Sequence, residues 1–526
     1  MKHQIPSTKH QKSSKLQAPT GTGLERVLML GAWSFSGVWC LVFGVSFLVS
    51  SGRAAAQLKP NIVVILAVDL GWGSVGCYGA KGVKTPNIDR LAREGRRFTQ
   101  AYASGSVCSP TRYAVMTGRY FWRTSVKDGM VLPSNAPLHI ETNRVTLASL
   151  CKSQGYSTAA FGKWHLGLTT ERVMEWSKPL RPGPLEIGFD YFFGQAANIG
   201  SGPHSFIENH EVTGHIPGEP IIVQGGSQAG DTTTGIKAHW KPDHVMETLT
   251  HRVTGWIETN QARPFFVYFA PNAVHEPIVP NPAFTGSPYG KYGDFIDDLD
   301  WCVGQVLAEL DKLKLADKTL VIFTSDNGGV VNPGNESCAA AMKAGLAING
   351  PLRGGKHSEW EGGFREPFVV RWPGEVPAGT VSEQVVCLSD LLATFAGLLN
   401  APLPKGGAED SFDARRAFTE AKPGAPVRDR VILQAADATY AIRMGDWKLI
   451  ERSGAPVFES VRNKRKAQKA ENKRKGPQKP NELFNLKEDP SESKDVLAAN
   501  GERAAQMKRA LEAARERGFT RPGAGD

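Results

Sequence analysis

The sequence predicts an α/β protein in which helices sandwich a large, mostly parallel β-sheet, followed by a smaller antiparallel α+β domain. Short apolar runs rich in β-branched residues alternate with helical segments, a pattern typical of a parallel sheet covered on both faces. Glycines and polar side chains follow these runs, where α/β sheets usually bind their ligands. Towards the C-terminus the pattern changes to short alternating strands.

The N-terminal segment has the pattern of an export signal. Residues 27–50 are apolar and follow a basic stretch, and Ala54 and Ala56 fit a signal-peptidase site with cleavage after Ala56. We therefore predict a signal peptide over residues 1–56 and an exported protein, either periplasmic or secreted. The apolar run is long enough to cross a bilayer, so an uncleaved anchor is the alternative, and a membrane contact is expected only in that case.

A buried strand and a helix are expected directly after the signal segment. Residues 61–68 form an apolar, β-branched run that predicts a buried strand, and it ends at Asp69 before a glycine-rich loop. The next helix is bounded by Thr85 or Asn87 as N-cap and by Gly95 as C-cap.

Later segments repeat this theme. Residues 146–167 predict a helix, a turn at Gly155, a strand and a loop, and residues 263–277 predict a strand that ends near His275. A long amphipathic helix precedes the expected strand 319–324. The acidic residues of that helix are interpreted as its solvated face: Asp297, Asp298 and Asp300.

We predict a main domain over residues 57–420 and a smaller antiparallel domain over residues 421–526. Residues 428–453 predict a meander, which a basic insertion at 461–480 interrupts before a terminal helix. The net charge of +10 is concentrated in this insertion and at the N-terminus. We interpret the insertion as solvated charge, with attraction to a polyanion as the alternative. No nucleic-acid-binding motif accompanies it, so nucleic acid is not an expected partner.

The loops after the expected strands carry one set of chemical groups. Oxygen ligands without clustered thiolates or imidazoles suit a hard cation such as calcium or magnesium. Cations beside such a metal suit sulfate or phosphate, and histidines suit proton transfer. These residues alone predict a hydrolase of anionic esters: Asp69, Asp326, Asn327, Lys163, Lys356, Arg112, His165 and His275.

Ordered sequence blocks then identify a family. They are "CSPTR" at 108–112, "GKWHLG" at 162–167, "PNAVHEP" at 271–277, "SDNGG" at 325–329 and "GGKHSEWEGGFREP" at 354–367. With these blocks the chain resembles type I sulfatases of the arylsulfatase group, within the alkaline-phosphatase-like superfamily. The resemblance extends from about Lys59 to the end, apart from the basic insertion. It implies the alkaline-phosphatase-like fold for residues 57–420, as the catalytic sulfatase domain.

The resemblance also implies a maturation step at Cys108. In this family the cysteine of Cys-x-Pro-x-Arg is oxidised to formylglycine by a formylglycine-generating enzyme, which is thus an expected partner. The hydrated aldehyde attacks sulfur, the alcohol leaves, and sulfate departs when the aldehyde re-forms, so that one hard step becomes two. The substrate implied is a sulfated carbohydrate or an aryl sulfate.

The same resemblance implies roles for the other residues. One calcium ion would be held by Asp69, Asp326, Asn327 and the group made from Cys108. Arg112 would orient that group, and Lys163 and Lys356 would bind sulfate oxygens. His165 would be the base for sulfate elimination, and His275 would protonate the leaving alcohol.

One position departs from the family pattern. Val68 stands where the family usually has the first of two consecutive aspartates, and Ser74 stands where another aspartate is common. Loss of a carboxylate ligand weakens calcium binding. Three hypotheses therefore stay open: a calcium-dependent sulfatase, a phosphoesterase of the same superfamily, and a metal-impaired, non-catalytic binder of sulfated glycans. The sequence does not determine the sugar or the position of its sulfate.

Overall fold

The structure is a computed structural model that describes residues 59–127, 129–224, 232–237, 239–422, 424–452 and 480–525. The predicted signal segment and the basic insertion, except for Pro480, lie outside these residues. Within the described part of the chain, no helix combines the length and the apolar character that a membrane span requires.

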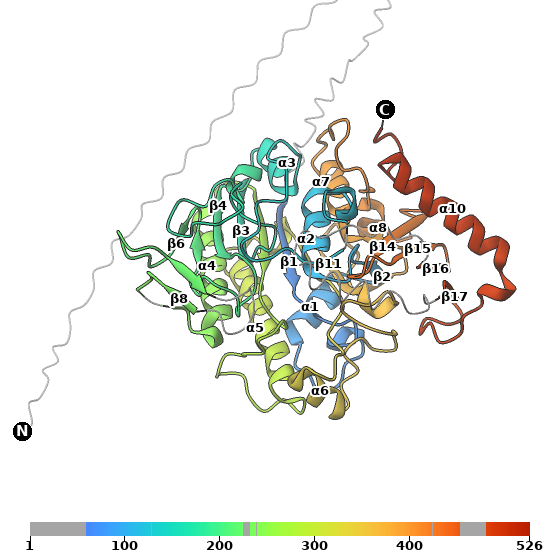
Figure 1. Ribbon diagram of the computed structural model, residues 1–526, viewed down its shortest axis with the longest axis horizontal. Helices are drawn as coiled ribbons and strands as arrows, with labels where there is room; N and C mark the ends of the chain where they lie inside the picture. Colours follow the sequence, from blue (N-terminus) through green and yellow to red (C-terminus); the bar gives the residue numbers. More distant parts are fainter. Residues whose placement is uncertain are drawn as a thin grey trace, which may run out of the picture. The chain divides into compact units, whose positions relative to one another are not determined.

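A sheet of eleven strands forms the centre of the fold (Figure 1). Five neighbouring strands at its centre run parallel, in the order β10 (Thr319–Ser325), β1 (Asn61–Ala67), β9 (Phe265–Ala270), β3 (Ser157–Lys163) and β4 (Tyr191–Gln195). Antiparallel pairing continues the sheet through β11 (Arg365–Arg371) and β2 (Arg96–Tyr102). The predicted mostly parallel mixed sheet is confirmed. The shorter strands are β5 (Ile207–Glu208), β6 (Glu211–Val212), β12 (Thr380–Ser382) and β13 (Val386–Cys387), with a separate pair β7 (Ile222–Gln224) and β8 (Thr232–Thr234).

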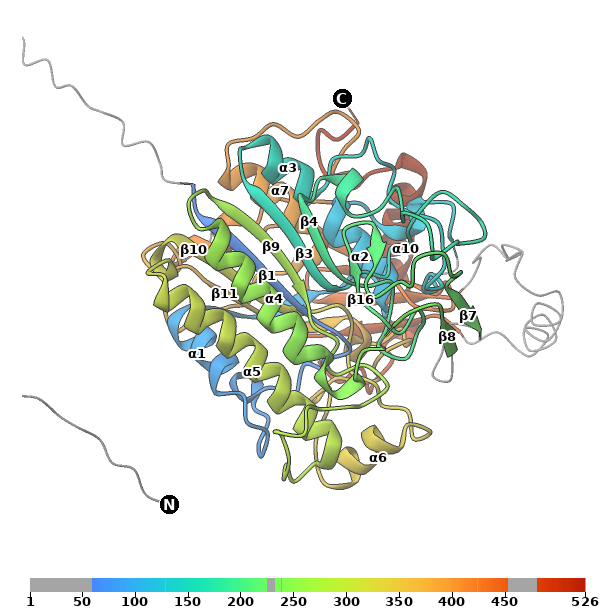
Figure 2. The same cartoon turned by 90° about the vertical axis from the view of Figure 1, so that its left-hand side faces the viewer.

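Helices cover both faces of this sheet, as Figure 2 shows. Alternate residues of β1 point into two cores: Val64 and Leu66 into one, and Val63 and Ile65 into the other. The first core is covered by α2 (Cys108–Thr117), α3 (Leu147–Ser153), α7 (Leu391–Leu398) and α8 (Arg415–Thr419). The second is covered by α1 (Pro86–Glu94), α4 (Val245–Asn260), α5 (Gly290–Lys312) and α6 (Glu336–Lys343).

The caps predicted for α1 are confirmed, whereas the interpretation of Asp298 and Asp300 on α5 as part of a solvated face is wrong; Asp297 is only partly buried. Thr85 is the N-cap and Gly95 the C-cap of α1. Asp298 and Asp300 are buried, with 0% and 2% of their surface exposed. The Asp300 carboxylate accepts the N–H of Ile88 at 2.8 Å, and Asp298 accepts that of Asn281 at 3.0 Å. These carboxylates bind backbone donors that begin neighbouring segments, so burial satisfies both partners.

A second, four-stranded antiparallel sheet is formed by β14 (Arg430–Gln434), β15 (Tyr440–Met444), β16 (Trp447–Glu451) and β17 (Glu482–Asn485). The terminal helix α10 (Gly501–Arg517) covers it. The predicted meander and terminal helix are therefore present. The hydrophobic core beneath the four-stranded sheet also includes Tyr102, Tyr120 and Phe364, which precede this sheet in the chain. The two sheets therefore share buried side chains.

A buried ionic cluster joins the small sheet to the segment that precedes β11. The Lys448 ammonium of β16 lies 3.1 Å from Glu361 and 2.8 Å from Glu492, and all three side chains have no exposed surface. Glu361 also pairs with Arg365 at 2.9 Å and accepts the Tyr102 hydroxyl at 2.6 Å. Each charge in the cluster therefore has a partner, which burial requires.

His139 makes the fold sensitive to acid. It packs against Tyr113 and Phe121, with ring centroids 5.6 and 4.9 Å apart, and its burial lowers its pKa to about 4. The unfolded chain binds a proton at His139 below pH 6.5, whereas the folded chain does so only near pH 4. The stability that neutral His139 contributes is thus complete above pH 6.5 and is lost as the pH falls towards 4.

We expect the native protein to lose about 2–3 kcal/mol more unfolding free energy than His139→Asn between pH 7 and pH 4. Urea denaturation at each pH measures the difference, with replacement of the exposed His251 by asparagine as the control. Parallel pH profiles for the native protein and His139→Asn would contradict this account.

Candidate active site

The carboxyl ends of parallel strands meet at one edge of the large sheet and place the predicted residues there. Asp69 follows β1, and Asp326 and Asn327 follow β10. Lys163 ends β3, with His165 two residues on, and His275 lies in the loop after β9. These residues lie far apart in the sequence but close together in the structure, because the carboxyl ends of parallel strands lie at the same edge of a sheet.

Cys108 begins helix α2 and is buried, with none of its surface exposed. The Lys163 ammonium lies 3.1 Å from its sulfur, and an Asp69 oxygen lies 3.9 Å away. Burial, followed by the charge of Asp326, raises the pKa of the Cys108 thiol, although Lys163 and Lys356 oppose this. The thiol is thus protonated at neutral pH and a poor nucleophile.

The N-terminus of α2 also favours negative charge at this place. The N-cap residue, Val107, provides no side-chain acceptor for the first backbone N–H groups of the helix. These donors and the positive end of the helix dipole attract an anion. Cys108 therefore lies where an oxyanion would be stabilised.

Arg112 lies one helical turn after Cys108 on the same face of α2 and is completely buried. Its Nε donates a hydrogen bond to an Asp326 carboxylate oxygen at 3.0 Å, and its Nη2 lies 2.8 Å from the same oxygen as an ion pair. The guanidinium also donates to the Lys163 backbone oxygen at 2.7 Å. Arg112 thus fixes the ends of β10 and β3 relative to α2.

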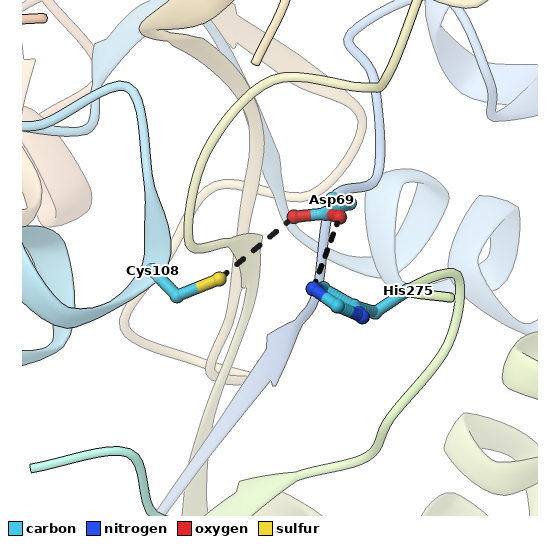
Figure 3. Close-up of side chains that lie close together, drawn as sticks. All are labelled: Asp69, Cys108 and His275. Atoms are coloured by element: carbon cyan, nitrogen blue, oxygen red, sulfur yellow. Dashed lines mark hydrogen bonds and ion pairs between the residues drawn. The ribbon is translucent and has the colours of Figure 1, made fainter. Parts of the chain in front are cut away.

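Asp69 is at the centre of the cluster. Figure 3 shows the Cys108 and His275 side chains pointing towards its carboxylate, and the His275 Nε2 lies 3.7 Å away. Asn327 donates to one oxygen at 2.8 Å and Lys356 to the other at 2.7 Å. Burial alone would raise the pKa of Asp69, but Lys356 and Lys163 outweigh it, so the pKa is lowered and the group is ionised.

The His165 ring is held by a backbone oxygen. Its Nε2 lies 2.8 Å from the Leu132 carbonyl. A carbonyl only accepts hydrogen bonds, so Nε2 carries the proton and Nδ1 keeps its lone pair. Nδ1 has no hydrogen-bond partner among the described residues, and burial together with Lys163 and Arg112 holds the pKa of His165 well below 6.5. This tautomer is that of a base.

His275 is oriented by its neighbour in the chain. Its Nδ1 lies 2.6 Å from the Glu276 carbonyl oxygen, which leaves Nε2 towards Asp69. Burial and then Lys356 and Lys163 lower its pKa well below 6.5. An anionic ester bound by the two lysines would offset their charge and raise this pKa, which suits a group that protonates a leaving alcohol.

The oxygen donors fit a hard divalent cation. Asp69 and Asp326 supply carboxylates, and the buried Asn327 Oδ1 has no hydrogen-bond partner within the described residues. A free carbonyl oxygen beside two carboxylates suits calcium or magnesium. The two departures from the family pattern supply no ligand: Val68 is apolar and buried, and the Ser74 hydroxyl donates to the Ile348 carbonyl at 3.0 Å.

Sequence reasoning missed two groups at this site. The Leu132 carbonyl, which orients His165, is a backbone atom in a loop without a recognisable pattern. Glu366 is a completely buried carboxylate on β11, and the negative charges of Asp326 and Asp69 act on it. A charged residue inside the apolar run "REPFVVRW" was the signal for Glu366.

Comparison with known proteins identifies the family of this chain. A family model described as Sulfatase matches residues 60–401. The N-acetylgalactosamine-6-O-sulfatase of Bacteroides thetaiotaomicron is 35% identical over 91% of this chain and 97% of its own length. The human steryl-sulfatase is 32% identical over 70% of this chain and 71% of its own length.

A solved structure related to the metabolism of multiple glycosaminoglycans by Bacteroides thetaiotaomicron superposes with a TM-score of 0.79. It shares 34% identity and covers 88% of this chain and 100% of its own. The chain therefore belongs to the sulfatase family, with the alkaline-phosphatase-like fold that its residues predict.

Proposed function

We propose that this sulfuric ester hydrolase removes sulfate from a sulfated sugar, by means of formylglycine made from Cys108 and one bound calcium ion. The observation that carries the proposal is the position of Cys108 at the N-terminus of α2, beside Lys163 and Asp69 and one turn before Arg112. A formylglycine-generating enzyme would act on Cys108 before or during export. The apolar segment 27–50 supports a periplasmic or secreted location.

The sugar class rests on the relatives. The bacterial N-acetylgalactosamine-6-O-sulfatase is similar over nearly the whole of both chains, whereas the match to the human steryl-sulfatase is shorter. A sulfated amino sugar of a polysaccharide is thus the preferred substrate. Since steryl-sulfatases share the family, the substrate is decided by side chains outside the sulfate-binding cluster.

The residues of this chain divide the chemistry between them. Lys163 and Lys356 bind sulfate oxygens as point charges, and Arg112 holds the reacting side chain in place. Asp326 accepts the proton of the attacking hydroxyl, and Nδ1 of His165 accepts a proton when sulfate is released. His275, once it is protonated after the anionic ester has bound, gives its Nε2 proton to the leaving alcohol and keeps on Nδ1 the proton that the Glu276 carbonyl accepts. When bound, calcium would be held by Asp69, Asp326, Asn327 and the residue-108 side chain, and would supply Lewis-acid stabilisation of the sulfate charge.

Metal removal tests the proposal. We expect protein matured with a formylglycine-generating enzyme to release sulfate from N-acetylgalactosamine 6-sulfate, to stop when calcium is chelated, and to recover when calcium is restored. Ion chromatography measures the sulfate, and mass spectrometry of the Cys108 peptide confirms that the sulfur has been replaced by an aldehyde oxygen.

Two results would contradict it. If Cys108 were an unmodified thiol in protein isolated from its own host, the chain would lack the formylglycine nucleophile that the proposal requires. Faster turnover of an aryl phosphate diester than of any sulfate ester would assign the chain to phosphoester hydrolysis instead.

A further inference from the structure

A buried pair of amide side chains spans the end of β3 at the active site. Gln195 ends β4, and Asn272 lies in the loop between β9 and His275, with 1% and 2% of their surfaces exposed. The Asn272 Nδ2 donates to the Gln195 Oε1 at 2.7 Å. Because β3 lies between β4 and β9 in the sheet (Figure 2), this bond links the two neighbours of the strand that ends at Lys163.

On one side of this bond, the backbone at Gln195 holds the segment that carries Lys163 and His165. Lys163 lies opposite Gln195 in the parallel register of β3 and β4. The Trp164 N–H donates to the Gln195 carbonyl at 3.0 Å. The His165 N–H donates to the Ala196 carbonyl at 2.9 Å. His165 has a φ of 57°, and a residue without glycine's freedom keeps such a backbone only where its surroundings hold it.

On the other side, Asn272 belongs to the loop that carries His275. The His275 N–H donates to the Asn272 carbonyl at 3.0 Å. Because the His275 ring binds the carbonyl of the next residue, the ring moves with this loop. The Val68 N–H donates to the Ala273 carbonyl at 2.9 Å, and the Val274 N–H donates to the Val68 carbonyl at 2.6 Å. The loop is thus fixed to β1 by its backbone and to β4 by the amide bond.

Packing alone does not account for the amide pair. The Gln195 Nε2 and the Asn272 Oδ1 are buried and have no hydrogen-bond partner among the described residues. Turning both amides over would only exchange which atoms lack a partner. Two apolar side chains of the same shape would fill this space without leaving buried polar atoms unsatisfied. The pair therefore fits a role in which the link between the two loops matters more than stability.

We propose that Gln195 and Asn272 form a positioning pair for His275. The pair holds this histidine at a fixed place relative to Lys163 and His165. The inference rests on the proposed function, because the role of His275 in protonating the leaving alcohol comes from there. Lys163 binds the sulfate, so the bond sets where the acid lies relative to the ester bond that breaks. Proton transfer needs hydrogen-bond reach, and a displacement of about 1 Å costs up to about 100-fold in rate.

The double variant Gln195→Met with Asn272→Leu tests this, since it removes the bond and keeps the approximate size and shape of both side chains. We expect kcat for N-acetylgalactosamine 6-sulfate to fall about 10- to 100-fold, with KM little changed because the lysines still bind sulfate. The kcat for 4-nitrophenyl sulfate should fall less than about 3-fold, since nitrophenolate leaves without a proton. The urea midpoint should equal or exceed that of the native protein.

Asn61→Leu is the matched control. Asn61 is also a buried amide that links neighbouring strands, but it lies at the amino end of β1, away from the site. It donates to the Thr319 hydroxyl at 3.4 Å and accepts the Phe265 N–H at 3.2 Å. This variant should unfold at lower urea and keep the native kcat for both substrates. Gln195→Asn shortens one amide by a methylene group and should show the same selective loss if the double variant does not fold.

The two substrates separate the claims. A native kcat for the sugar sulfate in the variants that lack the bond would overturn the positioning role and leave the proposed function intact. Equal losses of kcat for the sugar sulfate and the aryl sulfate would also overturn it, because a displaced acid affects the poor leaving group most. If the matured native protein released sulfate from neither substrate, the proposed function itself would fail, and this inference with it.

Discussion

The Cys108→Ala variant is expected to release no measurable sulfate, a loss of at least about 10⁴-fold. The change removes the sulfur that is replaced by oxygen when formylglycine is made, so no aldehyde can form at residue 108 next to Lys163 and Asp69. Sulfate release from N-acetylgalactosamine 6-sulfate measures the loss. Native chain expressed without the maturation enzyme should be equally inactive, because the buried thiol stays protonated.

Binding measurements show whether the variant fails for this reason. Cys108→Ala should still fold, since alanine is a good helix former at the start of α2, and should still bind the sulfated sugar through Lys163 and Lys356. Turnover above one part in about a hundred of the native rate would contradict covalent catalysis through residue 108.

Lys448→Met should destabilise the fold by about 3–5 kcal/mol, the usual cost of leaving buried carboxylates unpaired. Glu492 loses its cation, Glu361 keeps only its pair with Arg365, and neither carboxylate reaches water. Urea denaturation measures the change in unfolding free energy. Calcium-free protein is used so that metal binding does not contribute to the difference between the native protein and the variant.

Lys312→Met is the matched control. Lys312 also pairs with two glutamates, Glu258 and Glu309, but its side chain is 58% exposed. Exposed pairs contribute about 0–1 kcal/mol, so this variant should unfold close to the native midpoint. Similar midpoints for Lys448→Met and Lys312→Met would contradict the importance of the buried cluster.

The sequence predicted which candidate site residues would lie close together, because their positions follow from strand direction. Once β1, β10, β3 and β9 are parallel, the polar residues after each strand must meet, and Asp69, Asp326 and Lys163 do. The caps of α1 were predictable for a similar reason, since they depend on a few neighbouring residues.

Groups whose partners lie on other elements were not predictable. Asp300 on α5 has the sequence spacing of a solvated residue, yet it binds the start of α1, and only the packing of the two helices shows this. Glu366 is visible in the sequence as a charge, but its complete burial on a strand beside β10 depends on strand pairing. His165 was found, but its tautomer depends on the Leu132 carbonyl.

The buried cluster around Lys448 affects how such chains can recombine during evolution. Glu361 lies five residues after Lys356, so the segment that carries this lysine, which we propose binds sulfate, is held to β16 and to Glu492. A crossover near residue 420 would bring together two halves whose buried charges were selected separately. We expect chimaeras of homologous chains to fold only when residues 353–365 and the C-terminal sheet come from the same parent.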